Sequence, residues 1–180
     1  MSKVTKYSGL GKIYFNKILR EIIKIAHLNK RNINILDYGC GTKQLSKILK
    51  KKIYNFDILE EYNEVNKLEF KNYDIIIFNH VLMYFEKDKI LELFSNIKKE
   101  NKYCEIVVGI GKQNLISKIL KFISLNFNAH QGTKCSYQDQ LDIINQMNVI
   151  NHTKNIFLMT DIYYFNLFNY EKISQSYITK

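Results

Sequence analysis

Apolar residues recur along this chain in two patterns, one typical of amphipathic helices and the other typical of buried strands. Helical spacing of apolar side chains between charged ones predicts five helices, over residues 12–29, 42–51, 88–99, 113–125 and 136–147. Short continuous apolar runs, several of them β-branched, predict four strands, over residues 33–37, 53–56, 74–78 and 105–108. Two further strand-like segments close the chain, at residues 149–153 and 160–167.

The alternation of strand and helix predicts an α/β fold with a doubly wound, mostly parallel sheet. The last two strands are joined by a short link, so we expect an antiparallel C-terminal edge. Only 16 residues separate Asp57 from Asp74, too few for a full helix and a strand, so one crossover helix should be reduced to a loop. No linker rich in Pro, Gly or Ser divides the chain, and we expect one domain over residues 1–180.

Charge and composition modify this picture only slightly. The formal net charge of +10 would favour a nucleic-acid partner. The lysines are dispersed, however, and the excess of Lys, Ile, Asn and Tyr is what an AT-rich genome would produce by itself. Nucleic acid is therefore a possible partner but not the favoured one.

Localisation follows from features that the sequence lacks. No apolar run approaches the length of a transmembrane helix, and residues 1–7 do not resemble a signal peptide. The three cysteines are far apart and have no C-x-x-C spacing, which predicts neither a disulfide framework nor a metal site. We expect a cytoplasmic protein.

The candidate chemistry begins where the first strand ends on Asp37 and turns through Gly39-Cys40-Gly41, with Thr42 as the expected N-cap of the next helix. A dinucleotide site would need a third glycine where Gln44 stands, and an acid before the turn would repel a pyrophosphate. The acid suits a ligand with an ammonium group, such as S-adenosylmethionine. Asp57 follows Asp37 by 20 residues, the spacing at which a second carboxylate can accept both ribose hydroxyls.

Three blocks in this order resemble class I S-adenosylmethionine-dependent methyltransferases, in particular small single-domain members of the ubiquinone and sugar methyltransferase branch. The blocks are Ile35–Thr42, Phe56–Ile58 and Tyr73–Phe85. The resemblance implies a Rossmann-like fold with S-adenosyl-L-methionine as cofactor. It also implies four parts: an N-terminal helical cap (1–30), a cofactor-binding half (31–110), acceptor-side helices (111–148) and a closing strand pair (149–170).

The resemblance also implies roles for individual residues. Those expected to contact the cofactor are Asp37 near its ammonium, Gly39, Cys40 and Gly41 under its methionyl part, Asp57 at the ribose, and Ile58, Glu64 and Val65 around the adenine. Asn79, also expected to bind the cofactor, and His80 would line the reactive end. The segment Ala129–Leu141 resembles a later block of the family and adds His130, so the candidate catalytic bases are His80 and His130.

Lys43 departs from the family pattern, which commonly has a third glycine at this position. Its side chain could crowd the methionine, or its ammonium could pair with the cofactor's carboxylate. The pairs Gly9-x-Gly11 and Gly109-x-Gly111 lack the full phosphate-loop pattern, and we predict that both are turns.

The function that follows is methyl transfer to a small-molecule or glycan-like acceptor, at a hydroxyl group. Two alternatives stay open. The net charge would suit an RNA methyltransferase, although the chain lacks the Pro-Pro-Tyr type of loop found in relatives that methylate base amines. Lys43 and the missing crossover helix would suit a binding or scaffold protein that has lost catalysis.

Overall fold

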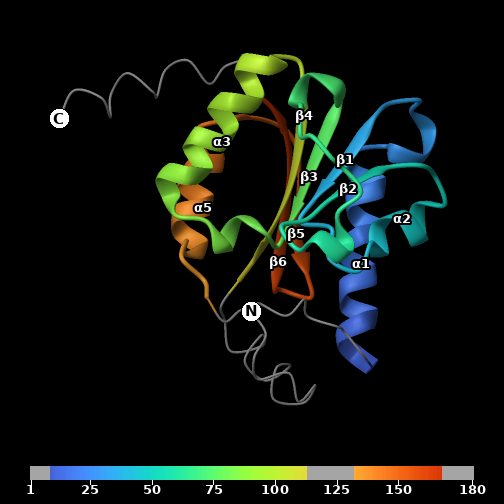
Figure 1. The fold of residues 1–180 in the computed structure, drawn as a ribbon. Coiled ribbons are helices and arrows are strands. Elements are labelled where there is room, and N and C mark those ends of the chain that lie inside the picture. Colours follow the sequence, from blue (N-terminus) through green and yellow to red (C-terminus); the bar gives the residue numbers. More distant parts are fainter. Residues whose placement is uncertain (1–8, 113–131, 168–180) are drawn as a thin grey trace.

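A computed structural model describes residues 9–112 and 132–167 (Figure 1). Six strands form one sheet in the order β2-β1-β3-β4-β6-β5. Strands β2 (Tyr54–Phe56), β1 (Ile35–Tyr38), β3 (Ile75–Asn79) and β4 (Glu105–Gly111) are parallel. Strand β6 (Thr160–Asn166) runs antiparallel to β4 and to the edge strand β5 (Asn148–Ile156). The predicted mostly parallel sheet with an antiparallel C-terminal edge is confirmed.

Helices cover both faces of this sheet. The side chains of α1 (Gly9–Ile25) and α2 (Gln44–Leu49) join one buried cluster, which includes Ile35, Ile75 and Ile77 from the strands. Those of α3 (Lys87–Glu100) and α5 (Tyr137–Ile144) join a second cluster with the alternate strand residues. Because successive residues of a buried strand point to opposite faces, a continuous apolar run fills both clusters. The predicted helix over 113–125 lies outside the described residues.

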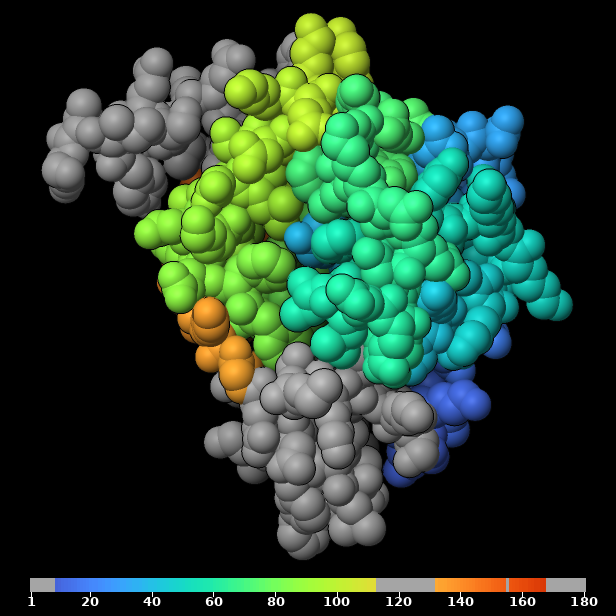
Figure 2. Space-filling view, in the orientation of Figure 1, coloured from blue at the N-terminus to red at the C-terminus, as the bar shows by residue number. Residues whose placement is uncertain are grey.

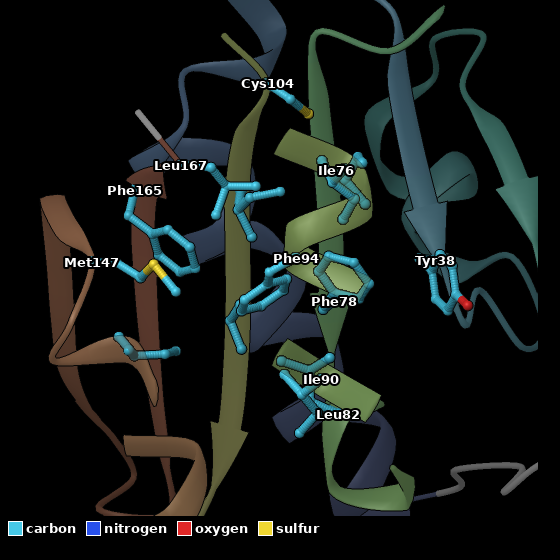
Figure 3. Packing of buried hydrophobic residues seen from close by; sticks show 14 of the residues in the cluster. Tyr38, Ile76, Phe78, Leu82, Ile90, Phe94, Cys104, Met147, Phe165 and Leu167 are labelled. Carbon is cyan, nitrogen blue, oxygen red and sulfur yellow. The ribbon is translucent and has the colours of Figure 1, made fainter. Parts of the chain in front are cut away.

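The cluster beneath α3 is built around aromatic rings. Phe94 of α3 lies between Phe78 of β3 and Phe165 of β6, with ring centroids 5.9 Å and 6.0 Å away (Figure 3). All three side chains are fully buried. This packing anchors α3 across β3 and β6, which lie on either side of β4, and so fixes the relative positions of the loops that leave these strands.

The segment between Asp57 and Asp74 contains no full helix, as predicted. It holds two single 3₁₀ turns, η2 (Glu60–Tyr62) and η3 (Phe70–Asn72). Further 3₁₀ turns follow α1 (η1, Leu28–Lys30) and β3 (η4, Leu82–Tyr84). The backbone N–H of Phe70 donates to Oε2 of Glu100 at 2.7 Å, which ties the segment to α3. Figure 2 shows the segment, in teal to green, on the surface beside the yellow-green α3.

Three local expectations are wrong. Helix α2 begins at Gln44 rather than at residue 42, because Lys43 has a left-handed backbone with φ of 56° and no side chain caps the helix. Gly9 begins α1, and Gly109 and Gly111 lie within β4, so neither glycine pair forms a turn. Helix α5, unlike α2, has a side-chain cap: Ser136 and Asp139 form a capping box that fixes its start.

Candidate functional site

The candidate residues meet at the carboxyl edge of the parallel strands. Asp37 and Asn79 lie at the ends of β1 and β3, which are neighbours in the sheet, and Asp57 directly follows β2. The chain crosses from β1 to β2 on one side and continues to β3 on the other, so β1 lies where the strand order reverses. Ligands of open α/β sheets bind outside this point.

The glycine turn is held against its neighbours by backbone contacts. The N–H groups of Gly39 and Cys40 both donate to the carbonyl of Phe56, at 2.8 Å and 3.1 Å. Gly39 has a φ of +79°, and a Cβ built on it would lie 2.5 Å from Cγ2 of Val81. Any other residue at this position would push the loop after β3 away from the loop after β1.

Asp57 joins the turn to the segment that follows β2. Its Oδ2 accepts from the N–H of Gly41 at 2.9 Å, and its Oδ1 accepts from the N–H of Leu59 at 3.0 Å. Each carboxylate oxygen keeps a second lone pair for a further donor. The next residue, Ile58, is 75% exposed, which leaves its side chain available to a ligand at this edge.

Asp37 is a buried acid whose charge is not compensated. Its side chain is 5% exposed, and within the described residues its carboxyl accepts no hydrogen bond. Burial, and then the nearby charge of Asp57, raises the pKa of Asp37 to about 7. A cation placed here would stabilise the ionised carboxylate, so the site fits an ammonium group.

Lys43 turns towards the segment after β2. Its Nζ lies 2.7 Å from Oε1 of Glu64, whose other oxygen accepts from the Asn55 side chain. The hydrogen bonds from Lys43 and Asn55 lower the pKa of Glu64. The structure therefore gives the lysine a protein partner, and that partner is the residue expected near the adenine.

Cys40 and Val65 are held by protein contacts that favour a structural role for both residues. Burial, together with the charges of Asp37 and Asp57, raises the pKa of the Cys40 thiol to about 12, so the thiol is not a ready nucleophile. Val65 is buried among the residues beneath α3, and the Asn63 side chain bonds both its N–H (3.0 Å) and its carbonyl (3.1 Å).

His80 is fixed by backbone and side-chain contacts. Its N–H donates to the carbonyl of Gly109 at 2.9 Å, and its backbone is left-handed with φ of 57°. The ring Nε2 lies 3.0 Å from Oγ1 of Thr160, which also shares a short hydrogen bond with the Tyr14 hydroxyl. Burial, partly offset by that hydrogen bond, raises the pKa of Tyr14 to about 12.

The glycines of β4 provide the space for the residues that end β3. A Cβ on Gly109 would lie 2.4 Å from Oδ1 of Asn79, and one on Gly111 would lie 2.9 Å from Cε1 of His80. Both side-chain polar atoms of Asn79 are buried without a hydrogen-bond partner among the described residues. They are available to a ligand that could donate and accept at the end of β3.

A buried ionic cluster lies next to Thr160 on the other face of the sheet, and sequence reasoning missed it. Asp161 is 1% exposed, and its Oδ2 lies 2.9 Å from Nζ of Lys112 and 2.5 Å from the hydroxyl of Tyr137. The only sequence signal was a polar pair, Thr160-Asp161, at the start of an otherwise apolar strand.

His130, the second candidate base, lies outside the described residues.

Residues 9–112 and 132–167 contain no group of three or more His, Cys, Asp or Glu side chains that could hold a metal ion. The same residues contain no helix that is long and apolar enough to span a membrane.

Comparison with known proteins shows which family the chain resembles. Residues 10–153 match the family described as "Methyltransferase domain". No curated protein matches the sequence significantly. Among solved structures, the chain resembles magnesium protoporphyrin IX methyltransferase from Synechocystis PCC 6803 with bound SAH, at 14% identity and a TM-score of 0.55, over 89% of this chain and 88% of that one.

Two other solved structures share the fold. N-methyltransferase NodS from Bradyrhizobium japonicum WM9, in complex with S-adenosyl-L-homocysteine, is 10% identical with a TM-score of 0.57, over 85% of this chain and 87% of that one. Small RNA methyltransferase HEN1 is 12% identical with a TM-score of 0.62, over 92% of this chain and 27% of that one.

The chain belongs to the methyltransferase domain family, since the match covers most of its length. It is a class I S-adenosylmethionine-dependent methyltransferase, as the ordered sequence blocks predicted.

Proposed function

We propose that this member of the methyltransferase domain family methylates a hydroxyl group on a small-molecule or glycan-like acceptor, with His80 as general base. The observation that carries the proposal is the fixed position of His80 at the carboxyl edge, where its backbone N–H donates to Gly109 and its imidazole is bonded to Thr160. A base is needed only for a weakly acidic acceptor such as a hydroxyl. His130 remains a second candidate for the base.

The residues that we propose bind the cofactor lie along the same edge of the sheet. Asp37, buried and without a hydrogen-bonded partner among the described residues, would hold the ammonium, and the backbone of Gly39, Cys40 and Gly41 would lie under the methionyl part. Asp57 would accept both ribose hydroxyls, while Ile58, Glu64 and Val65 would line the adenine side. When bound, S-adenosylmethionine supplies an electrophilic methyl group on a positively charged sulfur.

The work of the protein is then alignment and proton removal. Asn79 would orient the acceptor with its buried amide, and His80 would take the proton that the hydroxyl loses as the oxygen–carbon bond forms and the carbon–sulfur bond breaks. Holding the reactants in line can contribute roughly 7–11 kcal/mol of the barrier. Proton removal by a positioned base contributes about 10²- to 10⁴-fold in rate.

The test combines binding with acceptor identification. Calorimetry should detect S-adenosylmethionine binding by the parent chain, and Asp57→Ala should weaken it. Labelled methyl transfer to fractionated cell extract should give a product that resists nuclease and carries a methyl ether. His80→Asn, which tolerates the left-handed backbone, should bind the cofactor normally but lose about 100-fold in kcat. Full activity of His80→Asn would refute the assigned base.

RNA is the second candidate acceptor, and one observation favours it. The net charge of +10 would support phosphate contacts. This candidate predicts a nuclease-sensitive labelled product and RNA binding that weakens steeply as the salt concentration rises. A salt-independent affinity for the acceptor would exclude it.

A further inference from the structure

Four large apolar side chains are exposed together beside the candidate site. Leu10 and Ile13 lie on the first turns of α1, and Phe157 and Leu158 form the turn between β5 and β6; each is between 52% and 63% exposed. The Tyr14 and Phe157 rings, with centroids 6.0 Å apart, join the two segments. Figure 1 shows the first turns of α1 and the β5–β6 turn at the same lower edge of the view. We call these four residues the apolar tip.

The turn in the apolar tip has an unfavourable sequence for its backbone. The N–H of Met159 donates to the carbonyl of Ile156 at 3.1 Å, and the two central residues, Phe157 and Leu158, have φ of 50° and 59°. Two positive φ angles define a type I′ turn, for which Asn-Gly is strongly preferred. Phe-Leu carries steric strain at both positions and exposes both side chains to water. A partner that takes up these side chains would offset the strain.

The charge beside the apolar tip indicates what that partner is. The exposed face of α1 carries Lys12 and Arg20, together with Lys17, which is paired with Glu21, near Leu10 and Ile13, and the whole chain has a net charge of +10. Protruding apolar side chains beside exposed cations are typical of segments that lie in a membrane interface, where the cations meet anionic headgroups. A folded protein partner would instead need a matching recess.

We propose that the apolar tip inserts into the interfacial region of a bilayer that contains anionic lipids. The apolar tip adjoins the carboxyl edge of the sheet, because Thr160 is bonded both to Tyr14 of α1 and to His80. Insertion would therefore turn this edge towards the membrane. This inference is independent of which acceptor is methylated. It names a surface that binds membranes whether or not the hydroxyl-acceptor proposal holds.

The chain contains no tryptophan, so one introduced tryptophan reports directly on insertion. Phe157→Trp should show a blue-shifted emission with vesicles of phosphatidylcholine and phosphatidylglycerol, and a much smaller shift with phosphatidylcholine alone. Tyr103→Trp is the matched control, because Tyr103 is also exposed, at 70% against 55% for Phe157, but precedes β4 at the opposite edge. Its emission should not change.

A second variant separates loss of binding from loss of folding. The double substitution F157N/L158G installs the preferred type I′ sequence, so it should unfold at the same or a higher temperature than the parent. It should also bind anionic vesicles at least tenfold more weakly in co-sedimentation. The proposal is overturned if the parent does not sediment with anionic vesicles, if Tyr103→Trp shifts as much as Phe157→Trp, or if F157N/L158G binds as tightly as the parent.

Discussion

Asp37→Asn should weaken cofactor binding and stabilise the protein without ligand. The Asp37 carboxyl is buried, and its pKa is raised from 3.8 to about 7 by burial and by Asp57. Asn keeps the shape and removes the charge. A charge-assisted hydrogen bond contributes about 1.5–3 kcal/mol, so we expect S-adenosylmethionine to bind about 10- to 100-fold more weakly.

The stability effect has the opposite sign. A carboxyl whose folded pKa lies above its unfolded pKa binds more protons in the folded state, so stability falls as the pH rises from 3.8 to about 7. The full difference corresponds to at most about 4 kcal/mol at higher pH. Because the new amide is also buried, we expect Asp37→Asn to gain about 1–3 kcal/mol at pH 8 and no stability at pH 4 in urea unfolding.

Calorimetry across pH supplies the second readout. Binding requires ionised Asp37 and a protonated amine on the cofactor, whose amino pKa is about 7.8. The parent's affinity should therefore peak near pH 7.4 and fall about fivefold at pH 6 and about 50-fold at pH 5. Asp37→Asn should lose the acid limb. The control Asp74→Asn, at the amino end of β3, should keep it. A parent affinity that does not change between pH 5 and pH 7.4 would refute the reasoning.

Three further substitutions test the packing of the site. Lys43→Gly relieves the strain of the left-handed backbone but loses an exposed ion pair to Glu64, so the free energy of unfolding should change by less than about 1 kcal/mol. Calorimetry should show an unchanged cofactor affinity, and a tenfold weaker affinity would mean that Lys43 contacts the cofactor. Gly39→Ala should destabilise by about 2 kcal/mol or more in urea unfolding, and adding Val81→Ala should recover part of the loss, since the new Cβ would meet Cγ2 of Val81 at 2.5 Å. Asp161→Asn should destabilise by about 3 kcal/mol in the same assay because it leaves the Lys112 ammonium without its buried partner, whereas an effect below about 0.5 kcal/mol would show that the ionic cluster is not structural.

The sequence was sufficient for features that depend on local pattern and chain direction. The apolar run Ile75–Phe78 could only be a buried strand, and parallel strands joined by crossovers bring their carboxyl ends to one edge. Asp37 and Asp57 follow from the strand ends and their 20-residue spacing, whereas Asn79 follows only from the resemblance to the methyltransferase family. The lost crossover helix after Asp57 followed from the length of the segment alone.

Features that depend on contacts between distant segments could not be predicted. His80 and Thr160 are 80 residues apart, and no local pattern indicates that they bond across β4. Lys43 was considered only against the cofactor, although Glu64 is its partner in the structure. The local sequence around Gly109 and Gly111 predicts a turn because glycine is common in turns, whereas each glycine leaves room for a side chain from the end of β3 or the residue after it.

The glycines on both sides of β3 explain how the reactive end is assembled. Gly39 after β1 leaves space for Val81, Gly109 in β4 leaves space for Asn79, and Gly111 leaves space for His80. The loop after β3 is thus inserted between the ends of two neighbouring strands, and a Cβ on either side would displace it. A site held in this way is preorganised by packing rather than by its own flexible side chains. Enlarging Gly111 should therefore disturb His80 as much as a change in the loop itself.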